Sequence, residues 1–216
     1  MKKKKCKQGI EIIDLSDILG TLCDNVSEDA KTFEDVLNLD NSLNRHIYLE
    51  DIESGIGATV ASMITFWNRY DDNNNIDVED RQPIKIYIDS YGGSLTDAFT
   101  IIDAIKMSKT PVWTITTGCG YSAGFFIGLV GHRRIGYPHS SYLYHEGSTA
   151  NSGTAGQFRN FADFYDRQLE QLKELVLMNT NIDENKYKEI KKDDVWLTAE
   201  DALEWGALDE ITSEVI

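Results

Sequence analysis

The stretch "PIKIYIDSYGGSLTDAFTIIDAIKMS", residues 83–108, joins two hydrophobic patterns across a pair of glycines. Its first part is rich in β-branched and aromatic side chains, which predicts a strand. The apolar residues that follow Ser94 recur at three- and four-residue steps, which predicts a helix with one buried face. These residues are Ala98, Ile101, Ile102 and Ile105. Between the two patterns, Gly92 and Gly93 permit a positive φ and leave backbone N–H groups exposed.

The same alternation of strand and helix patterns extends along most of the chain. Runs of β-branched and aromatic residues predict further strands at 45–52, 110–118, 133–137, 141–147 and 207–211. Helical spacing of apolar residues predicts further helices at 58–71, 118–130, 157–179, 183–192 and 198–206. In the helix over 157–179 this spacing predicts one apolar face, formed by Phe158, Phe161, Tyr165, Leu169, Leu172 and Val176. This order is typical of an α/β domain whose sheet is largely parallel.

Two segments fall outside this alternation. Residues 1–44 are polar and acidic, and we interpret them as an N-terminal arm, partly disordered, ahead of one domain over residues 45–216. Residues 71–82, "DDNNNIDVEDRQ", predict a charged surface loop with little core potential.

Near the C-terminus, the sequence indicates both the start and the end of a helix. Thr198, with Asp201 three residues later, predicts a helix N-cap, and Gly206 predicts the end of that helix. Just before this helix, Val195 and Trp196 are expected to be buried.

Composition limits the classes of partner. The chain has 216 residues, 41% of them hydrophobic, which suffices for one core. Lys and Arg number 21 against 36 Asp and Glu, and the formal net charge of −15 repels nucleic acid and anionic lipid. We therefore expect no nucleic-acid or membrane partner. Cys6, Cys23 and Cys119 lack a paired or metal-binding spacing, which is typical of reduced thiols.

Targeting signals are not recognisable. The basic start "MKKKKCKQG" is not followed by the apolar segment of a signal peptide. No stretch reaches the about 18 uninterrupted apolar residues of a membrane span. We therefore expect a cytoplasmic protein.

A serine stands among small residues in "GCGYSAGFF", residues 118–126. Small residues there could serve helix packing, or could let a substrate backbone approach Ser122. Taken alone, Ser122 is equally explained as a helix cap. The amide of Ala123 follows it, and exposed amides can hold an oxyanion. Cys119 is a rival nucleophile, although such a cysteine is more often a small core residue.

A histidine and an aspartate complete the candidate chemistry. His145 ends a predicted strand, where it is either a general base or a half-buried strand-end residue. Asp194 lies beside an apolar segment and could orient an imidazole, whereas Asp193 is interpreted as solvated. A serine, a histidine, an aspartate and paired amides form the set that acyl transfer needs. The remaining histidines are predicted to lie at the surface: His46, His132 and His139.

Four ordered motifs resemble the family of the Clp protease proteolytic subunit (ClpP). They are "IYIDSYGGSLTDAFTIIDAI", "TGCGYSAGFF", "YLYHEG" and "WLTAEDALEWGALDEI", and the resemblance spans residues 45–211. It implies the crotonase-like ββα superhelix and a serine endopeptidase without a metal or organic cofactor. By position, Ser122 matches the family nucleophile, His145 the general base and Asp194 the orienting carboxylate.

The resemblance also assigns binding groups and an assembly. The amides of Gly93 and Ala123 match the oxyanion hole. Gly92, Ser94, Gly147 and Ser148 belong to the segments that would hold an extended peptide or unfolded protein. The helix over 157–179 matches the handle through which two seven-membered rings stack. The resemblance therefore implies a homo-oligomer, a heptameric ring that can stack into a tetradecamer, with cleavage inside its chamber.

The sequence departs from the family pattern beside the matched residues. Tyr91 stands in place of a proline, Ala123 in place of a methionine, and Glu146 and Gly147 in place of Gln-Pro. None of these changes removes a matched catalytic group. Glu146, next to the base, either raises the pKa of His145 or faces solvent.

A further departure concerns the surface where the family docks its AAA+ unfoldase. Lys85 and Met107 stand at aromatic positions there, although Tyr87 is retained, which argues against dependence on such an ATPase. Three alternatives stay open: a catalytically silent ring-forming scaffold, an enzyme of the same fold acting on acyl-CoA thioesters, and a signal-peptide-peptidase-like enzyme with a Ser-Lys dyad. A cellular or phage role is equally open.

Overall fold

The computed structural model describes Lys4–Lys5, Glu11–Ile12 and residues 32–216, in two units over residues 1–46 and 47–216. In the first unit, β1 (Lys4–Lys5) pairs antiparallel with β2 (Glu11–Ile12). The helix α2 (Phe33–Leu43), which the sequence did not predict, begins at a capping box of Thr32. Most of the predicted arm, with Cys6 and Cys23, lies outside the described residues, so its boundary stays a prediction.

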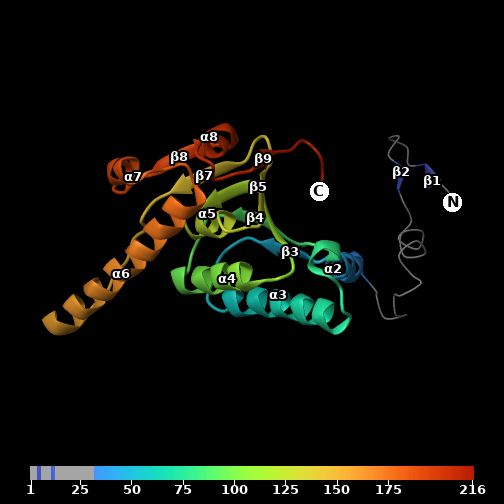
Figure 1. The fold of residues 1–216 in the computed structure, drawn as a ribbon, viewed down its shortest axis with the longest axis horizontal. Coiled ribbons are helices and arrows are strands. Elements are labelled where there is room, and N and C mark those ends of the chain that lie inside the picture. Colours follow the sequence, from blue (N-terminus) through green and yellow to red (C-terminus); the bar gives the residue numbers. More distant parts are fainter. Residues whose placement is uncertain (1–3, 6–10, 13–31) are drawn as a thin grey trace. The chain divides into compact units, whose positions relative to one another are not determined.

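Strands and helices alternate along the second unit, as predicted (Figure 1). Its strands are β3 (His46–Leu49), β4 (Ile84–Ser90), β5 (Val112–Tyr121), β6 (Arg133–Gly136), β7 (Ser141–Tyr144), β8 (Val195–Thr198) and β9 (Glu210–Ile211). Its helices are α3 (Ile56–Asn73), the 3-10 turn η1 (Val78–Asp80), α4 (Leu95–Met107), α5 (Ala123–Gly128), α6 (Ala155–Asn179), α7 (Glu184–Ile190) and α8 (Ala199–Glu204).

The sheet of the second unit is largely parallel, which confirms the predicted α/β class. Its strand order is β3-β4-β5-β6-β9, and β7 pairs with both β5 and β8. The long strand β5 has two partners in succession, because its residues 113–116 pair with β6 and its residues 119–121 pair with β7. In this sheet the pairs β4–β5, β5–β6, β5–β7 and β6–β9 are parallel, and the pair β7–β8 is antiparallel.

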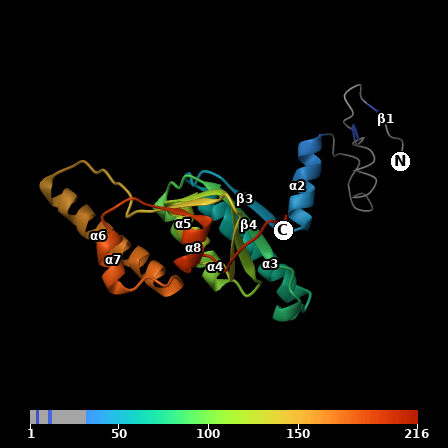
Figure 2. The same cartoon turned by 90° about the horizontal axis from the view of Figure 1, so that it is seen from above.

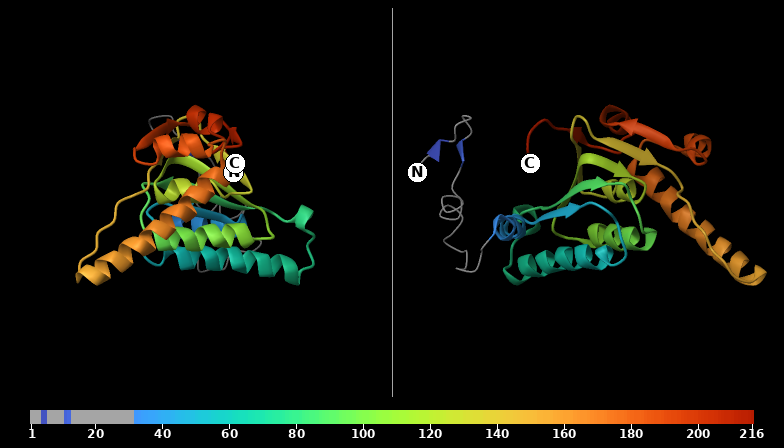
Figure 3. Two further views of the ribbon diagram at one scale, coloured as in Figure 1. Left: turned by 60° about the vertical axis from the view of Figure 1, so that its left-hand side comes forward. Right: turned by 180° about the vertical axis from the view of Figure 1, so that it is seen from behind.

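The helices lie in distinct places around this sheet. Figure 1 and Figure 3 show α3 and α4 side by side on one side of the strands. Figure 2 shows α6 and α7 at the opposite end of the unit from α3, with α6 extending outward. In the part of the chain that the structure describes, no helix is long and apolar enough to cross a membrane.

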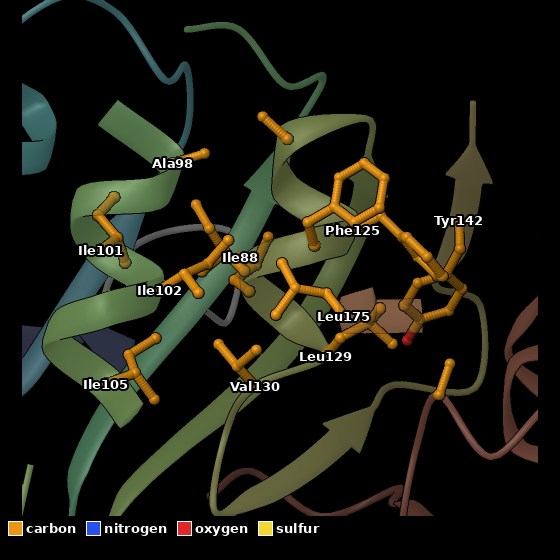
Figure 4. Packing of buried hydrophobic residues seen from close by; sticks show 14 of the residues in the cluster. Ile88, Ala98, Ile101, Ile102, Ile105, Phe125, Leu129, Val130, Tyr142 and Leu175 are labelled. Atoms are coloured by element: carbon orange, nitrogen blue, oxygen red, sulfur yellow. The ribbon is translucent and has the colours of Figure 1, made fainter. Parts of the chain in front are cut away.

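The predicted buried face of α4 is confirmed. Four residues on this face are buried: Ala98, Ile101, Ile102 and Ile105. They belong to the same core cluster as Ile88 of β4, Phe125 of α5 and Leu129, which follows α5 (Figure 4). The helix starts where Ser94 accepts a hydrogen bond from the Asp97 amide. The strand β4 and the helix α4, which Gly92 and Gly93 join, thus both contribute to the core.

The helix predicted over 118–130 is much shorter than expected. The strand β5 continues to Tyr121, and α5 occupies only Ala123–Gly128. Gly118 therefore lies in a strand, where a Cβ would stand 2.3 Å from Asp89 Oδ1. The glycines before Ser122 thus permit close approach between neighbouring strands rather than helix packing.

Most of residues 71–82 are exposed, as predicted for a charged surface loop, but the expectation of little core potential is wrong at the two ends of the segment. The helix α3 continues into this segment, and Asp71 is buried with a hydrogen bond of 2.7 Å from Thr110 Oγ1. Arg81 is also buried, and it pairs with Asp72 at 2.6 Å. Composition alone does not reveal such internally satisfied polar networks.

Two further expectations about burial are corrected. In α6, Leu172 and Val176 are buried as predicted, but Phe158 near the helix start is 54% exposed. The expected burial is confirmed in part for Val195, which is half-buried and packs against the core with Leu197, but it is wrong for Trp196, which is 60% exposed. Side chains alternate along the strand β8, so neighbours cannot both face the core. The capping box at Thr198 and the positive φ of Gly206 are confirmed.

Replacing Ile101 with alanine tests the core formed by α4. The fully buried side chain leaves a cavity, so Ile101→Ala should lower the free energy of unfolding by about 2–5 kcal/mol. Circular dichroism recorded during urea denaturation measures this free energy of unfolding. Thr100→Ala, on the exposed face of the same helix, should change it by less than ~0.5 kcal/mol; equal losses in both variants would contradict the assignment.

Candidate active site

Three neighbouring strands bring the predicted serine, histidine and aspartate to one edge of the sheet. Because Tyr121 pairs with Leu143, Ser122 directly follows β5 at the point where β7 runs beside it. Because Tyr144 pairs with Val195 in the antiparallel ladder, His145 and Asp194 are the next residues across from one another. The backbone register therefore gathers residues from distant parts of the sequence.

Ser122 occupies a sharp turn between β5 and α5. Its φ of 53° and ψ of −118° are rare for a residue with a side chain. Its N–H donates to the Leu143 carbonyl at 2.9 Å, which ties the turn to β7. Gly92 lies against it, since a Cβ on Gly92 would stand 2.7 Å from Ser122 Cβ. The turn is thus held on both sides.

Two backbone amides are available beside the serine. Gly92 O accepts from Ile52 N at 3.0 Å, and Ser94 N donates to Ile52 O at 2.7 Å. In such a parallel bridge the amide of Gly93 faces away from Ile52. Within the described ranges, neither Gly93 N–H nor Ala123 N–H makes a backbone hydrogen bond. Both amides can therefore serve an incoming oxygen.

His145 lies beside the aspartate. Its Nδ1 is 3.4 Å from Asp194 Oδ1, and the Asp194 side chain is 64% exposed. Its Nε2 is buried and has no hydrogen-bond partner among the described residues. The structure thus brings the imidazole and the carboxylate together, but Ser122 Oγ does not hydrogen-bond to Nε2.

A pocket of about 490 Å³ opens beside these groups. Ser122, His145, Gly93 and Ala123 line it together with the predicted substrate residues Gly147 and Ser148. The other two predicted substrate residues do not line it: Gly92 is buried, and Ser94 caps α4.

The pocket also contains residues that sequence analysis missed as site residues. Its far wall comes from one face of α6, with Phe161, Tyr165, Gln168 and Leu172 at helical steps. Sequence periodicity predicts an apolar face on this helix, but only as a face that packs against the rest of its own subunit. A loop of about ten residues separates His145 from α6, so nothing local indicates that this helix returns to the site.

The chain resembles proteins of one family over most of its length. The sequence model described as Clp protease matches residues 44–215. The ATP-dependent Clp protease proteolytic subunit 2 of Treponema denticola is 35% identical over 132 residues, which cover 60% of this chain and 66% of the relative. The matched part thus spans just under two thirds of that relative's length.

Two further relatives carry similar names. The ATP-dependent Clp protease proteolytic subunit 2 of Thermobifida fusca is 34% identical over 143 residues, 63% of this chain and 68% of the relative. The subunit 3 protein of Synechococcus sp. is 32% identical over 169 residues, 76% of this chain and 79% of the relative.

Cys119, the rival nucleophile, does not line this pocket. Its side chain is buried in β5, and burial together with the nearby Asp89 carboxylate raises the pKa of its thiol to about 11. The reactive thiolate is therefore scarce at neutral pH. Of the other histidines, His132 and His139 are exposed as predicted, while His46 is half-buried.

Alkylation of a variant that keeps only Cys119, with Cys6→Ser and Cys23→Ser, tests this conclusion. At pH 8 the folded thiol should react with iodoacetamide at least ~10-fold more slowly than in urea, because its raised pKa keeps it protonated. The rate should climb as pH rises toward 11. Mass spectrometry measures the adduct, and rapid labelling at pH 8 without urea would contradict the buried, protonated thiol.

Proposed function

We propose that this chain, which belongs to the Clp protease family, is a serine endopeptidase that cleaves peptide bonds through an acyl-enzyme on Ser122. Its second unit has the crotonase-like ClpP fold of that family. The observation that carries the proposal is the register of β5, β7 and β8, which puts Ser122, His145 and Asp194 at neighbouring strand ends. A serine, a histidine and an aspartate grouped in this way favour acyl transfer over the other chemistries weighed.

In the proposed reaction, His145 acts through its Nε2. The buried Nε2 takes the proton from Ser122 as Oγ attacks a peptide carbonyl carbon. Asp194, 3.4 Å from Nδ1, holds the imidazole in the tautomer that leaves Nε2 free to accept. Catalytic hydrogen bonds often tighten only when substrate binds, so closure of the Ser122–His145 bond is expected on binding.

The oxyanion would rest on two amides. Gly93 N–H and Ala123 N–H lie at the pocket edge without other backbone partners among the described residues. Each such donor contributes ~3 kcal/mol of transition-state stabilisation in comparable enzymes. The tetrahedral intermediate then collapses, the C–N bond breaks, and His145 gives its proton to the leaving amine. A water molecule repeats the sequence on the acyl-enzyme and regenerates Ser122.

The proposed substrate is an extended peptide or unfolded protein. Gly93 on one side and Gly147 and Ser148 on the other flank the serine, which suits a strand laid between them. The inner wall is apolar, from Leu95, Phe126 and Leu172, and fits an apolar side chain next to the cleaved bond.

The proposed assembly is a homo-oligomeric ring in the cytoplasm. Phe158 is 54% exposed near the start of α6, and a partner helix would cover this apolar side chain. Met107, 78% exposed, and Lys85 replace aromatic residues on the surface where the family docks an unfoldase, which argues against dependence on that partner.

A covalent probe tests the proposed chemistry. A fluorophosphonate should form an adduct on Ser122, and Ser122→Ala should abolish it and reduce peptide hydrolysis by at least ~10⁴-fold. His145→Ala should reduce both strongly, because Oγ then lacks its base. Cys119→Ser is the matched control and should keep both. Rings that form normally but never take up the probe would indicate a scaffold instead.

Particle mass tests the assembly. Mass photometry should give seven or fourteen times the 24.4 kDa chain mass. Phe158→Asp should favour the smaller particle, since it places charge on the exposed apolar face of α6. Met107→Asp, at a more exposed apolar position on α4, should leave the mass unchanged. A monomer in wild type would argue against the ring.

A further inference from the structure

Two tyrosines hold Glu146, the residue next to the proposed base. Tyr165 of α6 donates its hydroxyl to the Glu146 carbonyl oxygen at 2.9 Å. Tyr187 of α7, which is 3% exposed, donates to Glu146 Oε1 at 3.4 Å. Of the two predicted roles of Glu146, facing solvent is therefore not what the structure shows, because Glu146 is half-buried and bound on two sides.

Apart from the contacts of Glu146, little restrains the imidazole of His145 or the backbone that follows it. Its contact to Asp194 spans 3.4 Å, and that carboxylate is mostly exposed. Gly147 follows at a φ of +79°, and the chain is exposed from there to Ala150. Glycine restricts the backbone least of all residues. The Glu146 carbonyl is therefore the first fixed point of the backbone after His145.

Tyr165 is itself well fixed. Its ring stacks on Phe161 of the same helix, with centroids 6.3 Å apart and planes 15° from parallel. Burial, together with the Glu146 charge, raises the pKa of Tyr165, so its hydroxyl stays protonated and able to donate. The Tyr187 contact is longer and reaches only the flexible carboxylate, so it restrains the backbone less.

We propose that Tyr165 is a positioning residue for His145, acting through its hydroxyl bond to the Glu146 carbonyl. This inference rests on the proposed function for its consequence in catalysis, but the restraint on the imidazole exists independently of activity. A base must stay within hydrogen-bond reach of the serine proton, so a looser strand end lowers the fraction of productive encounters.

Tyr165→Phe removes only the hydroxyl and keeps the stacked ring. Tyr48→Phe is the matched control, because Tyr48 is 57% exposed on β3 and does not line the pocket. Two readouts are taken on each full-length variant: kcat and KM on a peptide substrate, and the rate at which diethyl pyrocarbonate modifies His145. The exposed His139 is the internal reference for that reagent.

Tyr165→Phe should lower kcat about five- to tenfold with KM within twofold of wild type, as expected for one lost hydrogen bond that positions a base. His145 should be modified at least about fivefold faster, with His139 unchanged, while Tyr48→Phe matches wild type in both readouts. His145 modification at the wild-type rate in Tyr165→Phe would overturn the inference, whatever the peptidase assay gives. If wild type shows no hydrolysis but His145 is still modified faster in Tyr165→Phe, the positioning role stands and only the proposed function is rejected.

Discussion

The site depends on one short strand that has two different neighbours. β7 pairs parallel with the end of β5 and antiparallel with β8, so its four residues fix the serine on one side and the aspartate on the other. A slip of one residue in either ladder would turn His145 to the opposite face of the sheet. The hydrogen bond from Ser122 N to Leu143 O holds that register at the turn itself.

Steric limits around the glycines impose a second constraint. Gly92 lies so close to Ser122 that a methyl group would collide with it, and Gly93 approaches the Ile52 backbone even more closely. Both have positive φ, which only glycine adopts at little cost. The outcome is a loop pressed against the serine turn, with a free amide on its pocket side. The same compactness explains why Ser122 keeps a strained backbone: its surroundings leave it no alternative.

The helix α6 contributes to two parts of the molecule. Its C-terminal half packs Leu172, Leu175 and Val176 into the core, while its N-terminal half extends outward and carries exposed Phe158. Between these halves, Tyr165 contacts the segment that follows His145. The helix thus connects the core, the pocket wall and an exposed apolar surface, and the strand end that carries the imidazole is tied to it.

Much of this protein was determined by local sequence. The strand and helix order apart from α2 and β8, the inward face of α4, the Thr198 capping box and the identity of the candidate serine, histidine and aspartate all follow from short patterns, because periodicity and capping depend on near neighbours. Tertiary structure alone decided the rest. The burial of Asp71 and Arg81, the exposure of Trp196, the end of β5 at Tyr121 and the arrival of Tyr165 beside Glu146 each depend on contacts between segments far apart in sequence. Such contacts are selected by packing and by the pairing of buried polar groups, which no local pattern records.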